Sequence, residues 1–258
     1  MYIAVSMLFA ILIISFIIAL LLYSVYGWYK NLVLLRTVTD INRGTWSERE
    51  LVIDLLKSGI PAITIFHDLY VERRQGYYSQ IDAVVVTRVG IIVFEVKDYS
   101  GWIFGNGYHN QWTQILAYGR EKYRFYNPIL QNKGHIEALK TRLKGIADVP
   151  FYSVIVFYGN CTLKEINYIP AQTYVGYAGS VNLILEKIMR HNPTAHYNDK
   201  WEVINVLREA VANGGNHEIV QKHMQNIRSN SNESSGFLDQ VFSVMMRVMR
   251  SGRWKRRW

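Results

Sequence analysis

An unbroken apolar segment opens the chain. Residues 1–29 contain no Asp, Glu, Lys or Arg, and only three serines interrupt the apolar side chains between Ile3 and Tyr26. A helix over that stretch is roughly 36 Å long, which is enough to cross the ~30 Å hydrocarbon core of a bilayer. Neither a basic n-region nor a small-residue cleavage site is evident. The pattern therefore predicts a transmembrane anchor over residues 1–29 rather than a buried core helix or a cleaved signal peptide.

Aromatic and then basic residues follow this apolar segment. Its end carries Tyr23, Tyr26, Trp28 and Tyr29, as in an interfacial aromatic belt. The first basic residues of the chain are Lys30, Arg36 and Arg43. The positive-inside rule then places the rest of the chain in the cytoplasm. We expect a single-pass protein of the inner (cytoplasmic) membrane, with the lipid bilayer as one partner.

From residue 44 onward the pattern changes to short amphipathic and β-branched stretches. The spacing predicts helices over Trp46–Lys57, Asn127 to about Lys144, 181–190, 200–212 and 216–228. It predicts strands over Ile63–Leu69, Ile81–Val86, Ile91–Val96 and Val154–Tyr158. Residues 72–79 are expected to form a turn or exposed loop, and Gly101–Trp112 a loop with short strands. Because Thr87–Gly90 is typical of a hairpin turn, the expected fold class is mixed α/β with a central antiparallel hairpin.

Composition and charge narrow the class of protein. The chain has 258 residues, a net charge of +9 and a single cysteine, so a disulfide framework and a cysteine-based zinc site are excluded. Six of these net charges come from the basic residues of 247–258. The basic end, 247–258, suits the phosphates of anionic lipid or of nucleic acid. The segment 237–250 is amphipathic, and its apolar face also suits packing against a partner helix. The pattern leaves these three interpretations open.

The candidate chemistry lies on the central hairpin. A two-residue turn at Arg88-Val89 brings Asp82 opposite Glu95, and a three-residue turn shifts this pairing by one and keeps the two carboxylates neighbours. Lys97 lies on the same face of the strand as Glu95. Two carboxylates that close repel each other unless a cation lies between them, and oxygen ligands with open positions suit Mg²⁺. Carboxylates, a metal and a lysine together form a site for phosphodiester hydrolysis. The alternative is an exposed strand end with a solvated Glu95–Lys97 pair.

These residues resemble the PD-(D/E)xK nuclease signature, and the stretch from Gly44 to about Phe157 resembles the nuclease-related domain, NERD. The motifs that carry the resemblance are Gly44-x-x-Ser47-Glu48, Gln80-Ile81-Asp82, Gly90-Ile91 to Phe94-Glu95-Val96-Lys97-Asp98, Trp112 and Asn127-Pro128-x-x-Gln131-Asn132. Ser47 stands where the family usually has Gly, and Asp98 where Asn is common. The family implies a restriction-endonuclease-like fold: a mixed sheet with a central antiparallel hairpin flanked by helices. Here one transmembrane helix precedes it and a helical C-terminal region follows it.

The resemblance implies a role for each motif residue. Asp82, Glu95 and the Val96 carbonyl are expected to bind the metal, Mg²⁺ with Mn²⁺ as an alternative, and Lys97 to orient or activate the attacking water. Glu48 is a further metal-ligand candidate, although Thr45-x-x-Glu48 also matches a capping box. Gln131 is a candidate for hydrogen-bonding a phosphate or the bound water, or is a polar residue of the helix start.

Other polar and aromatic residues carry weaker predictions. His67, His109 and His135 match no zinc spacing, and a site with a metal and a lysine needs no histidine. On the helix that follows Pro128, the basic residues are candidates for phosphate contacts or form a solvated face; they are Lys133, Lys140, Arg142 and Lys144. The aromatic residues Tyr99, Trp102, Phe104, Tyr108 and Trp112 either stack on bases or pack under a loop.

The expected organisation has five segments. They are a transmembrane anchor (1–29), a juxtamembrane linker (30–43), a NERD nuclease-like domain (44–160), an α-rich extension (161–229), and a linker with a basic amphipathic C-terminal helix (230–258). We expect a membrane-anchored, Mg²⁺-dependent nuclease that hydrolyses phosphodiester bonds of DNA. Defence against incoming phage or plasmid DNA is a hypothesis from location and chemistry. The alternative is a non-enzymatic, membrane-bound nucleic-acid-binding or scaffold protein, and residues 161–258 are candidates for contacts within a homo-oligomer or with a protein partner.

Overall fold

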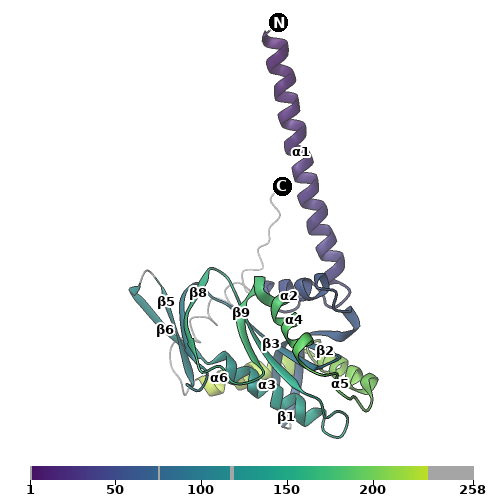
Figure 1. Cartoon of the computed structure of the whole chain (residues 1–258), viewed down its shortest axis with the longest axis vertical. Helices are drawn as coiled ribbons and strands as arrows, with labels where there is room; N and C mark the ends of the chain where they lie inside the picture. Colours follow the sequence, from purple (N-terminus) through teal and green to yellow (C-terminus); the bar gives the residue numbers. More distant parts are fainter. Residues whose placement is uncertain (1, 75, 117–118, 232–258) are drawn as a thin grey trace.

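Two mixed β-sheets organise the body of the chain in a computed structural model that describes residues 2–74, 76–116 and 119–231 (Figure 1). The first sheet has the order β1-β2-β3-β7-β9, and its strands are β1 (Ile65–Arg74), β2 (Tyr77–Thr87), β3 (Gly90–Asp98), β7 (Phe151–Tyr158) and β9 (Thr173–Tyr177). The second has the order β6-β5-β4-β8, with β6 (Glu121–Tyr126), β5 (Gln111–Leu116), β4 (Gly101–Asn106) and β8 (Cys161–Asn167). The mixed α/β fold class is confirmed.

The central hairpin has the predicted register. Strands β2 and β3 are antiparallel and pair from Thr87↔Gly90 to Ala83↔Phe94 around the two-residue turn. The turn is closed by the Thr87 hydroxyl, which donates to the Gly90 carbonyl at 2.7 Å and accepts the Val89 amide. Extending the register by one residue brings Asp82 level with Glu95, as the sequence predicts.

Helices cover both faces of the first sheet. Helices α2 (Trp46–Lys57) and α4 (Val181–His191) pack on one face, and α3 (Pro128–Arg142) and α5 (Lys200–Asn213) on the other. Along β3, Ile92 and Phe94 contribute to the core under α2 and α4, whereas Ile91 and Val93 contribute to the core under α3 and α5. This two-sided burial explains why β3 reads as a continuous apolar run in the sequence. It also places alternate residues of β3, including Glu95, on the α3 side.

Two segments differ in part from the prediction. Within the stretch predicted as a turn or exposed loop, residues 72–74 and 77–79 extend strands β1 and β2, so the connection between the strands is shorter than 72–79. Tyr78 there contacts helix α6 (His217–Ser231), because His223 Nδ1 donates to the Tyr78 carbonyl at 2.8 Å. The segment that follows residue 160 contains the three predicted helices, α4, α5 and α6, but it begins with two strands that were not predicted, β8 and β9. Strand β8 pairs in parallel with β4, and β9 with β7. Both pairings join segments far apart in the chain, so a local pattern does not reveal them.

The N-terminal helix continues directly into the body. Helix α1 (Tyr2–Leu35) projects away from the sheets, and its last residue, Leu35, is buried in the core with α2 (Figure 1). The predicted linker 30–43 is therefore helical over its first part. The stretch Ile11–Leu35, with a hydropathy of 2.3, is long and apolar enough to cross a membrane, and a signal sequence has the same properties. The predicted C-terminal amphipathic helix, 237–250, lies outside the described residues.

Candidate active site

The open end of the central hairpin gathers the predicted acidic and basic residues. The pairing of β2 with β3 stops at Ala83↔Phe94. Past this last pair, the Val96 amide donates to Asp82 Oδ2 at 2.7 Å, so a side-chain oxygen of β2 accepts the hydrogen bond that a β2 backbone carbonyl would accept in a regular ladder. Lys97 Nζ lies 2.6 Å from Glu95 Oε1. The strand end is thus an ordered group of charges, and Glu95 is only 1% exposed. The alternative of a solvated Glu95–Lys97 pair does not hold.

Helix α3 brings two more polar side chains to this group. Gln131 and His135 lie one turn apart, so they project from the same face of the helix. Gln131 Oε1 accepts a hydrogen bond from Lys97 Nζ at 3.1 Å. His135 Nε2 lies 3.1 Å from Glu95 Oε2, and its Nδ1 lies 2.8 Å from Ser79 Oγ. Both oxygens of Glu95 are therefore engaged, one by Lys97 and one by His135.

The residues around Gln131 explain how α3 is placed. Asn127 caps the helix, because its side-chain oxygen accepts the Ile129 amide at 2.9 Å. The Asn127 amide group also donates to three carbonyls of the β4–β5 turn, those of Asn106, Gly107 and His109. The fully buried Asn132 donates to the Val93 carbonyl at 2.9 Å and to Ser153 Oγ at 2.9 Å. These bonds fix α3 against β3 and β7, and therefore fix Gln131 beside Lys97.

Glu48 reaches the site from the first turn of α2. Thr45 is the N-cap of α2 and accepts the Glu48 amide, so the predicted cap is confirmed. The Glu48 carboxylate accepts from the Thr45 hydroxyl at 2.8 Å rather than from the backbone amide that a capping box uses. Its other oxygen, Oε2, is buried, has no hydrogen-bond partner among the described residues, and lies 3.6 Å from His67 Nε2.

The glycine of the opening motif is required by this packing. Gly44 has a φ of +63°, and a Cβ there would lie 2.4 Å from Glu48 Oε2 and 2.7 Å from the His67 ring. We expect Gly44→Ala to displace Glu48, to destabilise the fold by about 1–3 kcal/mol, and to lower any activity that needs Glu48. Thermal unfolding measures the loss of stability.

Gly59→Ala is the matched control for this prediction. Gly59 also has a positive φ, of +83°, but no atom lies within 4 Å of an added Cβ. Gly59→Ala therefore measures the cost of a positive φ at an alanine alone, without the contact with Glu48 and His67 that an alanine at position 44 would make. Equal losses of stability in the two variants would contradict the packing role of Gly44.

The charges of the site shift one another's pKa values in opposite directions. Burial raises the pKa of Asp82 well above its usual value, and the negative charges of Glu95 and Glu48 raise it further. Burial also opposes ionisation of Glu95, but Lys97 and His135 outweigh it and lower the pKa of Glu95. Burial opposes the charge on Lys97, yet Glu95 holds the pKa of Lys97 above its usual value. Lys97 is therefore a permanent cation that donates hydrogen bonds at neutral pH.

The raised pKa of Asp82 makes a testable link between stability and activity. Folded Asp82 binds its proton more tightly than the unfolded chain does. Its contribution to stability is therefore present below its unfolded pKa and is lost as the pH rises through its folded pKa. We expect Asp82→Asn to raise Tm at pH 7 in EDTA, because the amide oxygen still accepts the Val96 amide, and to abolish metal-dependent cleavage.

The exposed neighbour Asp98 provides the comparison for this variant. Asp98→Asn removes one charge from the same strand end and should leave both Tm and cleavage unchanged. If Asp82→Asn has a lower Tm than the parent chain in EDTA at pH 7, ionised Asp82 does not destabilise the folded chain, and the prediction is wrong.

The oxygen atoms of this group fit a divalent cation. In the described part of the chain, no set of three or more His, Cys, Asp and Glu side chains is already arranged as a metal site. However, Glu48 Oε2 is buried without a hydrogen-bond partner, and the carboxylates of Glu48, Asp82 and Glu95 are close enough to raise the pKa of Asp82. Carboxylate oxygens are the ligands that Mg²⁺ and Mn²⁺ prefer, and a cation there would relieve the repulsion among these acids.

The structure also brings together residues to which the sequence analysis gave no role at the site. His67 and His135 contact the carboxylates of Glu48 and Glu95, respectively, and so hold them in place. Arg43 pairs with Asp68 at 3.2 Å, and Gln80 Nε2 donates to Asp68 Oδ1 at 2.9 Å. Asp68 has a φ of +55°, which is uncommon for a residue other than glycine. No spacing rule in the sequence connects these pairs.

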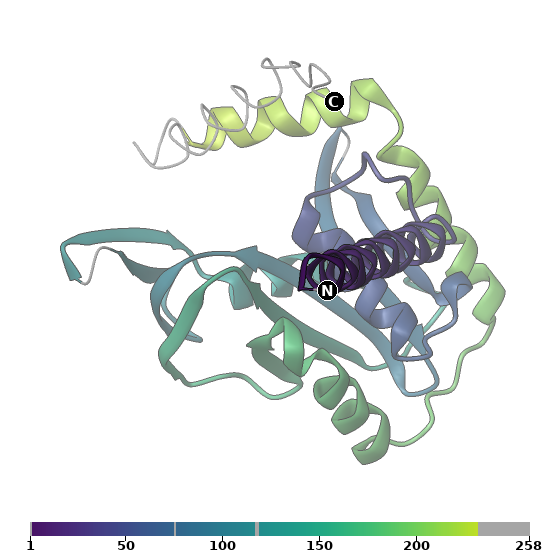
Figure 2. The same cartoon turned by 90° about the horizontal axis from the view of Figure 1, so that it is seen from above.

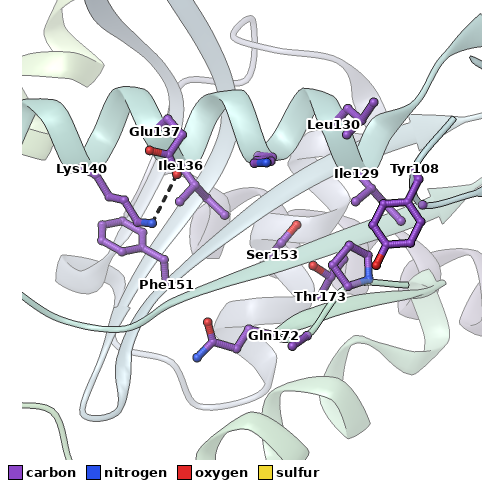
Figure 3. Close-up of a pocket in the computed structure, with 14 residues that line it drawn as sticks. Tyr108, Ile129, Leu130, Ile136, Glu137, Lys140, Phe151, Ser153, Gln172 and Thr173 are labelled. Carbon is purple, nitrogen blue, oxygen red and sulfur yellow. Dashed lines mark hydrogen bonds and ion pairs between the residues drawn. The ribbon is translucent and has the colours of Figure 1, made fainter. Parts of the chain in front are cut away.

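Two of the basic residues of α3 are exposed and pair with acids. Lys140 pairs with Glu137 at 3.3 Å and lies over the Phe151 ring, and Arg142 pairs with Glu209 at 2.8 Å. Lys140 and Glu137 border a cavity of about 330 Å³ between α3, β7 and the turn before β9 (Figure 3). This cavity shares no lining residue with the Asp82 group, so we do not assign it to the candidate active site.

The aromatic residues near β4 and β5 mostly pack together. Trp112 is 1% exposed and stacks on Phe157, and Tyr99 packs on Phe125 with ring centroids 4.6 Å apart. Trp102 is exposed and lies under Lys164. Packing, rather than base stacking, is therefore the role of Tyr99 and Trp112.

Comparisons with known proteins agree with this geometry. The family model of the nuclease-related domain, NERD, matches residues 43–158. An uncharacterized protein of Bacillus anthracis is 32% identical over 122 residues, which are 47% of this chain and 56% of that protein, so the match spans little more than half of the relative's length. No solved structure gives a significant match. The matched range contains all the residues of the hairpin site, together with Glu48 and Gln131. Residues 43–158 of this chain therefore form a nuclease-related domain.

Proposed function

We propose that this chain is a membrane-anchored nuclease that hydrolyses phosphodiester bonds of DNA with the help of Mg²⁺. The observation that carries the proposal is the arrangement at the end of the hairpin: Lys97 lies 2.6 Å from Glu95 and 3.1 Å from Gln131, beside Asp82. Metal-dependent hydrolysis of a phosphodiester uses carboxylates for the metal, a cation for the developing phosphate charge, and a positioned water. The nuclease-related domain supports the same conclusion.

Each residue has a defined task in the proposed mechanism. Asp82, Glu95, Glu48 and the Val96 carbonyl would hold the cation, which when bound polarises a phosphate oxygen and lowers the pKa of a water. Lys97 is protonated, so it donates to the attacking water or to the phosphate and does not remove the water's proton. Gln131 holds the Lys97 ammonium group in position. His135 fixes the orientation of Glu95, and it is therefore a positioning residue.

The decisive experiment measures cleavage by the full chain in detergent. Plasmid and single-stranded DNA are incubated with Mg²⁺, Mn²⁺ or EDTA, and Asp82→Ala is compared with Asp98→Ala. We expect metal-dependent cleavage that Asp82→Ala abolishes and Asp98→Ala retains. DNA binding that is indifferent to EDTA and to Asp82→Ala, with no cleavage of either substrate, would favour the non-enzymatic scaffold instead.

Membrane anchoring by α1 is the second part of the proposal. The apolar stretch Ile11–Leu35 supports it, and so does the junction at Leu35, where the helix enters the core without a flexible linker. The basic residues that follow the span favour a cytoplasmic body in the inner membrane. The full chain should remain in the membrane fraction after alkaline extraction, and its body should be protected from protease added outside intact spheroplasts. Release of a shortened soluble chain would identify a cleaved signal sequence instead.

The biological role that we propose is defence against incoming DNA. A nuclease held at the inner membrane meets foreign DNA as it enters the cell, whereas its reach into the rest of the cytoplasm is limited. If this is correct, expression of the full chain should lower phage plaque numbers or the efficiency of plasmid uptake, and Asp82→Ala should restore both.

A further inference from the structure

A cavity of about 430 Å³ lies beside the candidate active site, between the strands β1 and β2, the start of α2, and helix α6. Its volume is in the range of small-molecule sites. The residues that carry the argument are Glu48, Tyr70, Gln80, His223, Met224 and Ile227. Helix α6 lies outside the matched range 43–158 and on the side of the body opposite to α4 (Figure 2). The cavity is therefore built partly by the nuclease-related domain and partly by the C-terminal region of this chain.

The cavity is next to the proposed reaction centre. Glu48 lines it, and the same carboxylate is close enough to Asp82 to raise the pKa of Asp82. Gln80 also lines it and precedes Asp82 by two residues on β2, a separation of about 6.6 Å along a strand. A group attached to the nucleotide that is being cleaved can therefore reach the cavity.

The polar atoms of the cavity are mainly hydrogen-bond acceptors. His223 Nδ1 donates to the Tyr78 carbonyl, and burial lowers the pKa of His223, so Nε2 is left as an acceptor. Gln80 uses its amide nitrogen on Asp68, which leaves its oxygen as an acceptor. Glu48 also lines the cavity, and its carboxylate adds acceptor capacity. The Tyr70 hydroxyl adds a group that can donate.

The cavity does not suit a phosphate group. Among the described residues that line it, Arg43 is the one lysine or arginine. The guanidinium group of Arg43 is already engaged by Asp68 Oδ2 and by the carbonyls of Asp68 and Val211. The absence of a side chain at Gly214 leaves room for Arg43 in this position, because a Cβ there would lie 2.1 Å from the Arg43 Nη2 atom. An anion in the cavity would therefore face carboxylates without a cation to balance its charge.

The remaining walls suit a flat, neutral group. Met224 and Ile227 of α6 supply apolar surface. Tyr70 and His223 supply rings, which contact each other edge to face with their centroids 5.4 Å apart. A nucleobase has the complementary features: a flat apolar face for these walls and, in adenine, cytosine and guanine, an exocyclic amino group for the acceptors.

We propose that this cavity binds one unstacked nucleobase that carries an exocyclic amino group, next to the phosphate that is cleaved. The proposal rests on the proposed nuclease function and adds a substrate class to it. A base that enters the cavity must leave the stack, which is easiest in single-stranded or locally opened DNA. The chain is therefore expected to prefer such DNA to a paired duplex.

The test compares bases in single-stranded oligonucleotides bound to the full chain in detergent and EDTA. End-labelled oligothymidylates carry one central adenine, unsubstituted purine or thymine, and anisotropy gives their Kd. Unsubstituted purine has the same ring as adenine but no amino group. We expect the adenine oligonucleotide to bind about tenfold more tightly than the other two, as for other base-edge hydrogen bonds.

A pair of variants of α6 locates this preference. Met224→Trp fills the cavity and is expected to abolish the preference for adenine. Gln225→Trp places the same side chain at an exposed position of α6 that does not line the cavity, and should keep the preference. Gln225→Trp should also bind oligothymidylate as the parent chain does, and thermal unfolding monitored by circular dichroism shows whether each variant is folded.

The outcomes separate this inference from the proposed function. If the parent chain cleaves DNA but binds the adenine and purine oligonucleotides equally, the cavity does not bind a nucleobase amino group, and the nuclease proposal is unaffected. Retention of the adenine preference by Met224→Trp would also overturn the inference. If the parent chain neither binds nor cleaves any of these DNAs, the nuclease proposal itself fails.

Discussion

Replacement of Lys97 by Met is expected to lower the rate of DNA cleavage about 100- to 1,000-fold, which is the usual effect of removing one preorganised donor from a charged transition state. Lys97 contacts Glu95 at 2.6 Å and Gln131 at 3.1 Å, and its pKa is raised, so it remains a cation throughout the neutral pH range. Methionine keeps the aliphatic stem and removes only the charge and the hydrogen bonds. Cleavage rates with Mg²⁺ measure the effect.

The loss of a buried partner also affects folding, and a double variant separates the two effects. Lys97→Met leaves the carboxylate of Glu95, which is 1% exposed, with His135 as its remaining partner. Loss of one member of such a pair is destabilising. Glu95→Gln together with Lys97→Met removes both charges and should recover much of the lost Tm, while cleavage stays abolished.

Another lysine serves as the control for the loss of a positive charge. Lys144 is exposed, follows α3, and has no ion-pair partner among the described residues, so Lys144→Met should leave cleavage unchanged. A Lys97→Met variant that cleaves within tenfold of the parent rate would show that Lys97 has no direct part in the reaction.

Trp112→Ala is expected to lower the free energy of unfolding by about 3–5 kcal/mol, as for other fully buried large aromatic residues. The indole is 1% exposed, stacks on Phe157 with ring planes 3° apart, and contacts Phe125 edge on. Its Nε1 donates to the Asn106 carbonyl at 3.0 Å. The variant therefore loses both packing in the second sheet and a partly buried hydrogen bond. Chemical denaturation measures the change.

This change should also reach the active site. The Asn106 carbonyl that binds the indole also accepts a hydrogen bond from Asn127, the N-cap of α3. Helix α3 carries Gln131 and His135, so a displaced turn at Asn106 should lower cleavage as well as stability. Trp102→Ala is the comparison, because Trp102 is 38% exposed and should cost less than about 1.5 kcal/mol. Equal losses in the two variants would contradict the central role of Trp112.

The hairpin and its acids were predictable because they depend on local properties of the chain. A two-residue turn fixes the register of β2 and β3, and the register fixes Asp82 beside Glu95. The alternation of side chains along β3 then fixes Lys97 beside Glu95. The start of α3 at Pro128 is equally local, since the Asn127 cap and the proline act within one turn.

The contacts between distant segments were decided by the tertiary structure alone. Strands β8 and β9 follow the matched domain but complete its sheets through parallel pairing with β4 and β7. His135 was not expected at the site, yet the packing of α3 on β3 places it against Glu95. The Arg43–Asp68–Gln80 contacts also join segments with no sequence periodicity in common.

The sequence by itself thus determined which charged residues meet at the candidate site, its hairpin frame and the apolar N-terminal helix. These features follow from turn length, periodicity and hydropathy, which act over a few residues. The tertiary structure decided which residues hold the acids in place, and that helix α6 closes a cavity beside them. Such contacts depend on how whole elements pack, because the free energy of packing comes from surfaces that meet only in the folded chain.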